Sequence, residues 1–265
     1  MIIDFHTHMY PDEIAETTVE KMSSQAHLTP STDGTLRGLL ASMKENRVDR
    51  SVILPVLTKV THFNSVNDFA ARINERHEGK LTSFGAIHPD CPNYKACLRT
   101  LAGMGFKGIK LHPDFQGTYI NDIRYKRIIA EASELGMTIV VHAGIDAGLP
   151  DPIHCPPKLS LEVIKEVAPP KLVLAHVGGY RMWDRVEMFL IGERVYFDLA
   201  FSMGAIPEEQ LLRMIENHGA HKFLFGSDSP WMSVGDSIRA VEALPLTDSE
   251  KDSIFWKNAK TLLGI

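Results

Sequence analysis

The histidine pair His6-Thr7-His8 ends the apolar run that starts at Met1, and it is the feature of the sequence best suited to chemistry. Side chains two positions apart on a β-strand point to the same face of the sheet. Two imidazoles placed in this way can bind one metal ion. Such a pair also arises by chance, so its meaning depends on what the rest of the chain supplies.

Three later apolar runs also end in a residue that can bind metal. They close at His142, His176 and Asp228, each after a short stretch of β-rich composition. All of these side chains would therefore sit at the C-terminal ends of strands. Imidazole nitrogens with one carboxylate suit zinc or a similar divalent ion, and a catalytic site leaves one position open for water.

The elements that would position these residues alternate regularly between strand and helix. This alternation predicts the α/β class with a parallel sheet and right-handed crossovers, and eight units close a (β/α)8 TIM barrel. Catalytic groups of such barrels gather at the C-terminal ends of the strands. We expect segment 9–49 to hold an extra helix or a flap over the site. The eight predicted strands are residues 2–6, 50–56, 81–87, 106–112, 137–142, 171–176, 194–200 and 222–227.

Length and composition are consistent with this architecture. The 265 residues, 44% of them hydrophobic, match one barrel of about 250 residues, so residues 1–265 are expected to form a single domain. The net charge of −5 gives no general field for nucleic acid, and no 18-residue apolar run indicates a membrane span. We expect a cytoplasmic protein with a small-molecule substrate, without nucleic acid or membrane partners; a homodimer is compatible with these features.

Several motifs add to the histidine and aspartate pattern, which resembles that of the amidohydrolase superfamily. Together they resemble the amidohydrolase-related branch that includes aminocarboxymuconate-semialdehyde decarboxylase. The resemblance spans the whole chain and implies a metal-dependent barrel enzyme. The motifs are Gly-Ile-Lys-Leu-His-Pro at 108–113, Ala-His-Val-Gly-Gly at 175–179, Phe-Gly-Ser-Asp-Ser-Pro at 225–230 and Asn-Ala-Lys-Thr-Leu-Leu at 258–263.

The resemblance implies a ligand set of His6, His8, His142 and Asp228 around one divalent ion. Zinc is the expected metal, and manganese is not excluded. The ion would lower the pKa of a bound water toward neutrality, and Asp228 would take up the proton and later return it. His176 would polarise a substrate carbonyl.

Three further residues are expected to support the site. A lysine in the position of Lys110 is carboxylated in several amidohydrolases and bridges two metals; here a cationic, catalytic Lys110 beside one ion is preferred, with Lys110 and His176 as ligands if two ions bind. His112 shares the face of Lys110 and is expected to line the pocket. Asp4 is expected either to accept the other ring N–H of a ligating histidine or to be satisfied by backbone donors.

The rim of the pocket is expected to lie in loops. The Pro-rich loop 146–157 would shape the substrate pocket, since long loops at this face often carry binding residues. Four residues after the last three strands are candidates for contact with an anionic or planar substrate: Arg181, Trp183, Ser202 and Trp231.

The main functional prediction is a metal-dependent hydrolase of a C–N or C–O bond in a small amide, lactone or acid. The alternative is a non-oxidative decarboxylase. Members of the branch that act on resorcylate-like rings tend to have Glu in place of the first histidine, so His6 favours the muconate type among the decarboxylases. A third reading is a TatD-like deoxyribonuclease, which is disfavoured because Lys110 and His112 stand where those enzymes have Glu and because the net charge is acidic.

Overall fold

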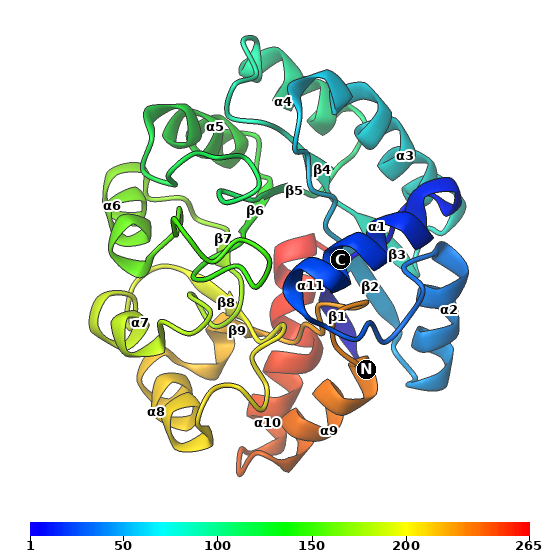
Figure 1. Ribbon diagram of the computed structural model, residues 1–265. Helices are drawn as coiled ribbons and strands as arrows, with labels where there is room; N and C mark the ends of the chain where they lie inside the picture. Colours follow the sequence, from blue (N-terminus) through cyan, green and yellow to red (C-terminus); the bar gives the residue numbers. More distant parts are fainter.

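Parallel strands alternate with helices around a barrel in the computed structural model, which describes residues 1–265 (Figure 1). Neighbouring strands pair in chain order, in one sheet of β1, β2 and β3 and another that runs from β4 to β9. The predicted (β/α)8 barrel is confirmed. The strands are β1 (Ile3–Thr7), β2 (Arg50–Ile53), β3 (Leu81–Ser83), β4 (Gly85–Ala86), β5 (Gly108–Leu111), β6 (Thr138–Val141), β7 (Leu172–Leu174), β8 (Tyr196–Asp198) and β9 (Phe223–Leu224).

Strands β3 and β4 are the two halves of one predicted strand, interrupted at Phe84. The backbone N–H of Phe84 still donates to the carbonyl of Ile53 at 2.9 Å, so the chain continues beside β2. Two asparagines of α3 (Phe63–Arg76) bond to the backbone on either side of the break, Asn74 at Ser83 and Asn67 at Ala86. The eight predicted strands therefore all form.

The barrel closes where β9 meets β1. The N–H of Phe5 donates to the carbonyl of Phe225 at 2.9 Å, and the N–H of Asp228 donates to the carbonyl of His6 at 2.8 Å. These bonds bring the segment after the last strand beside the first. Asp228 is thereby fixed next to the His6-Thr7-His8 pair.

Apolar side chains fill the barrel below its C-terminal mouth. Phe5 and Phe84 meet edge to face with ring centroids 5.9 Å apart, and both are fully buried. Helix α11 (Asn258–Leu263) plugs the opposite end with Leu262 and Leu263, which pack into the same cluster. Burial of one such side chain stabilises the folded protein by about 1.5–3 kcal/mol, and these packed side chains support the site from below. The other strand residues in the cluster are Ile3, Val52, Val140, Val173 and Leu224.

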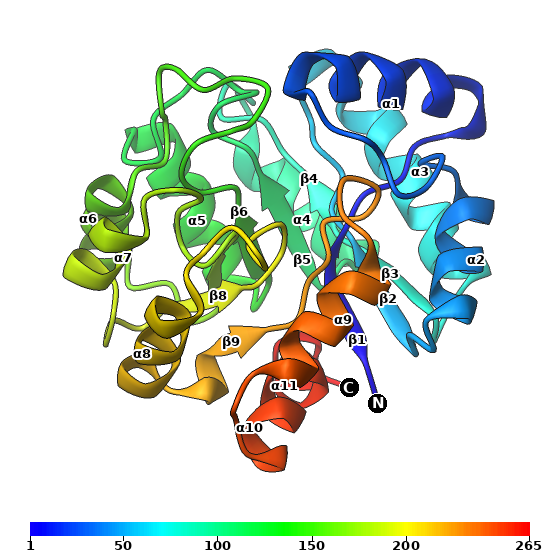
Figure 2. The ribbon, with the colours of Figure 1, turned by 60° about the horizontal axis from the view of Figure 1, so that its bottom comes forward.

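The helices surround the barrel, and one of them lies over its mouth. Figure 2 shows α1 at the end of the molecule opposite α10 and α11. The helix or flap expected in segment 9–49 is thus observed, as α1 followed by α2. No helix is both long and apolar enough to span a bilayer. The remaining helices are α1 (Asp12–Ala26), α2 (Leu36–Glu45), α4 (Tyr94–Gly103), α5 (Ile123–Glu134), α6 (Pro157–Val167), α7 (Trp183–Phe189), α8 (Glu208–His218), α9 (Val234–Ala243) and α10 (Asp248–Asp252), with a π-helical turn at Ser253–Lys257.

Candidate active site

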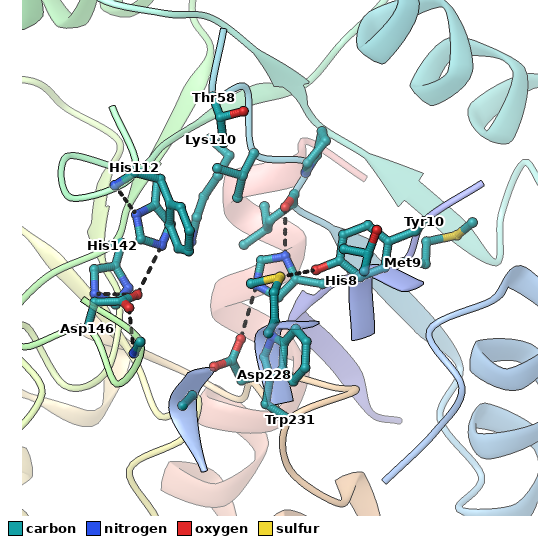
Figure 3. A pocket seen from close by; sticks show the side chains of 18 of the residues that line it. His8, Met9, Tyr10, Thr58, Lys110, His112, His142, Asp146, Asp228 and Trp231 are labelled. Carbon is teal, nitrogen blue, oxygen red and sulfur yellow. Dashed lines mark hydrogen bonds and ion pairs between the residues drawn. The ribbon is translucent and has the colours of Figure 1, made fainter. Parts of the chain in front are cut away.

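Three side chains from the first strand, its extension and the segment after the last strand converge at the mouth of the barrel. Nε2 of His6 and Nε2 of His8 are 3.2 Å apart, and Oδ1 of Asp228 lies 3.3 Å from the first and 3.1 Å from the second. Around a tetrahedral ion with bonds of about 2.0–2.1 Å, neighbouring ligand atoms would be about 3.3–3.4 Å apart. The triangle of these three atoms therefore has the dimensions of one face of a metal coordination shell. Figure 3 labels two of its three residues, His8 and Asp228.

The hydrogen bonds of the two rings determine which nitrogen faces this triangle. Nδ1 of His6 donates to Oδ2 of Asp198, and Nδ1 of His8 donates to the carbonyl of Leu54, both at 2.8 Å. A neutral imidazole that donates through Nδ1 keeps a lone pair on Nε2. Burial holds the pKa of His6 well below its ordinary value, so that ring is neutral. Two lone pairs and a carboxylate oxygen thus face one another, and a divalent cation fits this donor set.

Asp228 is held in the triangle by an unusual backbone conformation. Its φ of +67° lies in the left-handed region, which few residues other than glycine adopt, and His176 after β7 has a φ of +59°. Local strain of this kind clusters at functional sites. Burial acts to raise the pKa of Asp228, but His6 and His8 outweigh it and hold the pKa at about 2. The carboxylate is therefore ionised at neutral pH.

A second group of donors lies across the pocket from the triangle (Figure 3). Nε2 of His112 and Nε2 of His142 lie 3.6 and 3.7 Å from Oδ2 of Asp146, and Nε2 of His142 lies 3.8 Å from Oδ2 of Asp114. These distances are too long for hydrogen bonds, and both Nε2 of His142 and Oδ2 of Asp114 are buried without a partner. Burial raises the pKa of Asp114 and of Asp146.

His142 belongs to this second group and not to the triangle. Its Nδ1 lies 3.0 Å from Nε2 of His176, whose own Nδ1 donates to the carbonyl of Ala200 at 2.9 Å. In the neutral tautomer of His176 that donates through Nδ1, Nε2 accepts the proton on Nδ1 of His142. The structure therefore brings together only His6, His8 and Asp228 of the four ligands that the resemblance implied.

Lys110 adds a buried cation beside the triangle. Its Nζ lies 3.2 Å from Nε2 of His6, and the residue is only 1% exposed. Burial lowers the pKa of Lys110 to about 8, although Asp198, Asp228 and Asp146 act in the opposite direction. The amine is thus mainly protonated at pH 7 and can face an anionic group of a substrate.

The carboxylate that orients the His6 ring is Asp198, at the end of β8, and Asp4 takes the second of its two expected roles. Asp4 accepts the Ser227 hydroxyl at 2.5 Å and the N–H groups of Ser227 and His6 at 2.9 and 3.3 Å, so it supports the backbone of both closing segments. Burial raises the pKa of Asp4 to about 7. Asp198 was missed because it lies inside the predicted strand 194–200, and only the observed strand β8 ends at this residue.

The donors lie at the inner end of a cavity of about 530 Å³. Its walls are mainly apolar, and four aromatic residues other than histidine stand near the donors: Phe115, Tyr180, Phe201 and Trp231. Helix α1 and the segment before it form much of the roof with Met9, Tyr10, Ile14, Thr18 and Met22. No residue of this roof was predicted from the sequence, where the only signal was the length of the insertion between the first two strands.

The predicted rim residues divide into two sets. Trp231 and His112 line the cavity, and so do Asp146, Ala147 and Gly148, the first residues of loop 146–157. Their role in binding a substrate remains a prediction.

The remaining three predicted rim residues do not line the cavity, and their contact with a substrate stays a prediction. Trp183 donates from Nε1 to the carbonyl of His176 at 3.1 Å, and Ser202 is fully buried with its hydroxyl on the carbonyl of Ala200. Both therefore stabilise the turns that carry His176. Arg181 is exposed.

The fold and the donor set define a barrel enzyme that uses a divalent metal. The chain belongs to the amidohydrolase family, whose model Amidohydro_2 matches residues 3–265. The resemblance seen in the sequence is thus confirmed. No curated protein matches the chain at the sequence level.

Solved structures share the fold over nearly the whole chain. An uncharacterised TIM-barrel protein of Bordetella bronchiseptica is 17% identical with a TM-score of 0.79, covering 99% of this chain and 98% of its own. The 5-carboxyvanillate decarboxylase of Novosphingobium aromaticivorans, solved with manganese and 4-hydroxy-3-methoxy-5-nitrobenzoic acid, is 15% identical with a TM-score of 0.76, covering 100% and 96%. A 2,6-dihydroxybenzoate decarboxylase with bound 2,6-dihydroxybenzoate is 13% identical with a TM-score of 0.74, covering 100% and 99%.

These comparisons correct the main functional prediction. Several of the similar structures are decarboxylases of 2,6-dihydroxybenzoate or of 5-carboxyvanillate, so the comparisons do not support hydrolysis and favour the alternative reading, a carboxy-lyase. At such low identities the likeness itself shows the fold.

Proposed function

We propose that this protein is a metal-dependent, non-oxidative decarboxylase of a small aromatic or enolic acid. The observation that carries the proposal is the triangle of His6 Nε2, His8 Nε2 and Asp228 Oδ1 at the inner end of an apolar cavity with aromatic walls. The decarboxylases that share the fold support it.

The proposed ligands of the metal are His6, His8 and Asp228, with zinc or manganese as the ion. When bound, the ion would neutralise and orient the acid head of the substrate. His142 is kept as a further proposed ligand on the resemblance alone, since in this structure it pairs with His176. A single ion per chain is preferred over two.

The reaction replaces a C–CO₂⁻ bond with a C–H bond. A proton adds to the carbon that bears the carboxylate, the electron pair of the C–C bond then returns to the ring or enol, and neutral CO₂ leaves. We assign the transfer of that proton to Asp228 and His176, and contact with the anionic head to Nζ of Lys110. The apolar walls around these groups exclude water, which favours conversion of a charged carboxylate into neutral CO₂.

The test is a decarboxylation assay on purified protein loaded with zinc or manganese. A panel of ortho-hydroxy aromatic acids with a single carboxylate, 2,6-dihydroxybenzoate among them, is incubated in D₂O. We expect release of CO₂ and one deuterium at the carbon that bore the carboxylate, read by mass spectrometry and NMR. His8→Ala should abolish both signals, while Met188→Ala, at an exposed position of α7, should leave them unchanged. Hydrolysis of amides or lactones with no CO₂ from any acid would contradict the proposal.

A further inference from the structure

We infer that the outer part of the cavity binds an uncharged, apolar extension of the substrate. The substrate class is then a monocarboxylic acid with an alkyl or aryl substituent, and not a dicarboxylate. This inference rests on the proposed function, because it takes the donor triangle as the place of the acid head.

The outer part of the cavity is built from apolar side chains of two helices and the strand extension beneath them. Helix α1 supplies Ile14 and Met22, helix α3 supplies Val66 and Phe69, and Val56 follows β2. Ile14 is half exposed, so an apolar group bound beside it would remove further apolar surface from water. We call these five residues the apolar chamber.

Fixed charges of the cavity are confined to its inner end. Among all lining residues only Lys110, Asp146 and Asp228 carry a full charge, and no arginine lines the cavity. Lys110 is the sole lysine, and it lies against His6 at the triangle. A second carboxylate placed in the apolar chamber would therefore lose its hydration without meeting a lysine or an arginine, which is strongly unfavourable; the only histidine that lines the cavity from this side is His62, just before α3.

The charge of α1 favours the same class of substrate. Helix α1 has four exposed carboxylates and only one exposed lysine, so its net negative charge repels a dianion that approaches the cavity. Gln25, near the end of α1, donates from Nε2 to the carbonyl of Gly148 at 2.8 Å and so joins the roof to the loop after β6. The exposed charged residues are Asp12, Glu13, Glu16, Glu20 and Lys21.

The test measures binding without turnover, by calorimetry on the metal-loaded protein. The probes are 2-nitroresorcinol, in which a nitro group stands for the carboxylate, the same compound with a butyl group on the ring, and the same compound with a carboxylate in place of butyl. A buried CH₂ contributes about fourfold in affinity, so the butyl group should tighten binding by on the order of 100-fold. The added carboxylate should weaken binding at least about tenfold relative to the parent.

Variants locate the effect in the apolar chamber. Ile14→Ser and Val66→Ser should each remove at least about threefold of the butyl gain, which is the affinity of the butyl compound divided by that of the parent compound in the same variant. Ile123→Ser is the matched control, since this isoleucine of α5 is 56% exposed against 50% for Ile14 and lies outside the cavity. Met22→Arg should improve binding of the carboxylate probe.

The outcomes separate this inference from the proposed function. Binding of the parent compound that depends on His8 but gains nothing from butyl, or binding that tightens with the second carboxylate, overturns the apolar chamber alone. An absence of binding for all three probes counts against the acid site itself, and the inference then fails with it. Equal losses in Ile14→Ser and Ile123→Ser would also overturn it.

Discussion

The two histidines of the first strand are oriented by partners from other strands. Asp198 of β8 accepts the N–H of His6, and the carbonyl of Leu54 accepts that of His8. Each partner fixes one ring and leaves its Nε2 free to bind a cation. The geometry of the proposed metal site is thus set from outside the residues that would touch the ion.

Removal of a proposed ligand should empty the metal site. We expect about one zinc or manganese ion per chain in the intact protein and much less than one in His8→Ala and Asp228→Ala, with loss of most activity. Elemental analysis after dialysis gives the metal content. His142→Ala discriminates between roles: retained metal with lost activity agrees with its pairing to His176, and lost metal makes it a ligand. Active protein without metal would refute the prediction.

Asp198→Asn should weaken metal binding without removing it. An amide cannot accept the His6 N–H as strongly as a carboxylate does, so we expect metal affinity to fall by about 10–100-fold. Competition with a fluorescent chelator measures the affinity, and the activity of the variant should return at high metal concentration. Asp122→Asn, at the start of α5, is the surface control. An affinity equal to that of the parent protein would show that Asp198 has only a structural role.

Lys110→Ala should leave the number of bound ions unchanged and impair turnover or substrate binding. The amine lies beside His6 as a cation, and its removal takes away positive charge but no ligand in the single-metal arrangement. Metal analysis and steady-state kinetics are the two measurements. A fall from two ions to one or none, restored by short-chain carboxylates, would instead indicate a carboxylated lysine that bridges two metals.

At the scale of elements, the sequence predicted a helix or flap within segment 9–49 but not which residues of α1 line the cavity. The strands were predicted because β-rich runs alternate with helical periods, and the donors were predicted because they end those runs. Side chains of α1 reach the cavity only through tertiary packing, which no local pattern encodes. The same reason explains why the role of Asp198 and the pairing of His142 with His176 were not predicted, since both depend on the distance between separate strands.

Loss of the Gln25 hydrogen bond should loosen α1 over the cavity. Gln25→Ala removes the one bond from this side chain to the loop at Gly148, and we expect faster amide hydrogen exchange in α1 with little change in the core strands. Substrate KM should rise by more than kcat changes, because the donors at the inner end are untouched. Gln25→Glu should have the same effects as Gln25→Ala, because a carboxylate cannot donate to the carbonyl of Gly148. Unchanged exchange in both variants would refute this role.

At the scale of the whole molecule, the chain is expected to unfold as one unit. The single-domain prediction for residues 1–265 follows from the match between chain length and barrel size. Circular dichroism and intrinsic fluorescence should therefore give coincident thermal transitions, and added zinc or manganese should raise the midpoint of both. Two separate unfolding transitions in calorimetry would show that the chain has independently unfolding domains. His8→Ala is the control in which the metal effect should disappear.

The barrel seam between β9 and β1 gives the proposed ion a second consequence. His6 and His8 lie on one side of that seam and Asp228 lies on the other. A shared ion would therefore link the first and last strands of the barrel, and this link would be lost with the metal. Joining distant points of a chain restricts the unfolded ensemble, much as a crosslink does. Removal of the metal should then let the protein open first at the seam between β9 and β1. In limited proteolysis of the metal-free protein, the first cleavage should fall at this seam and not at another strand.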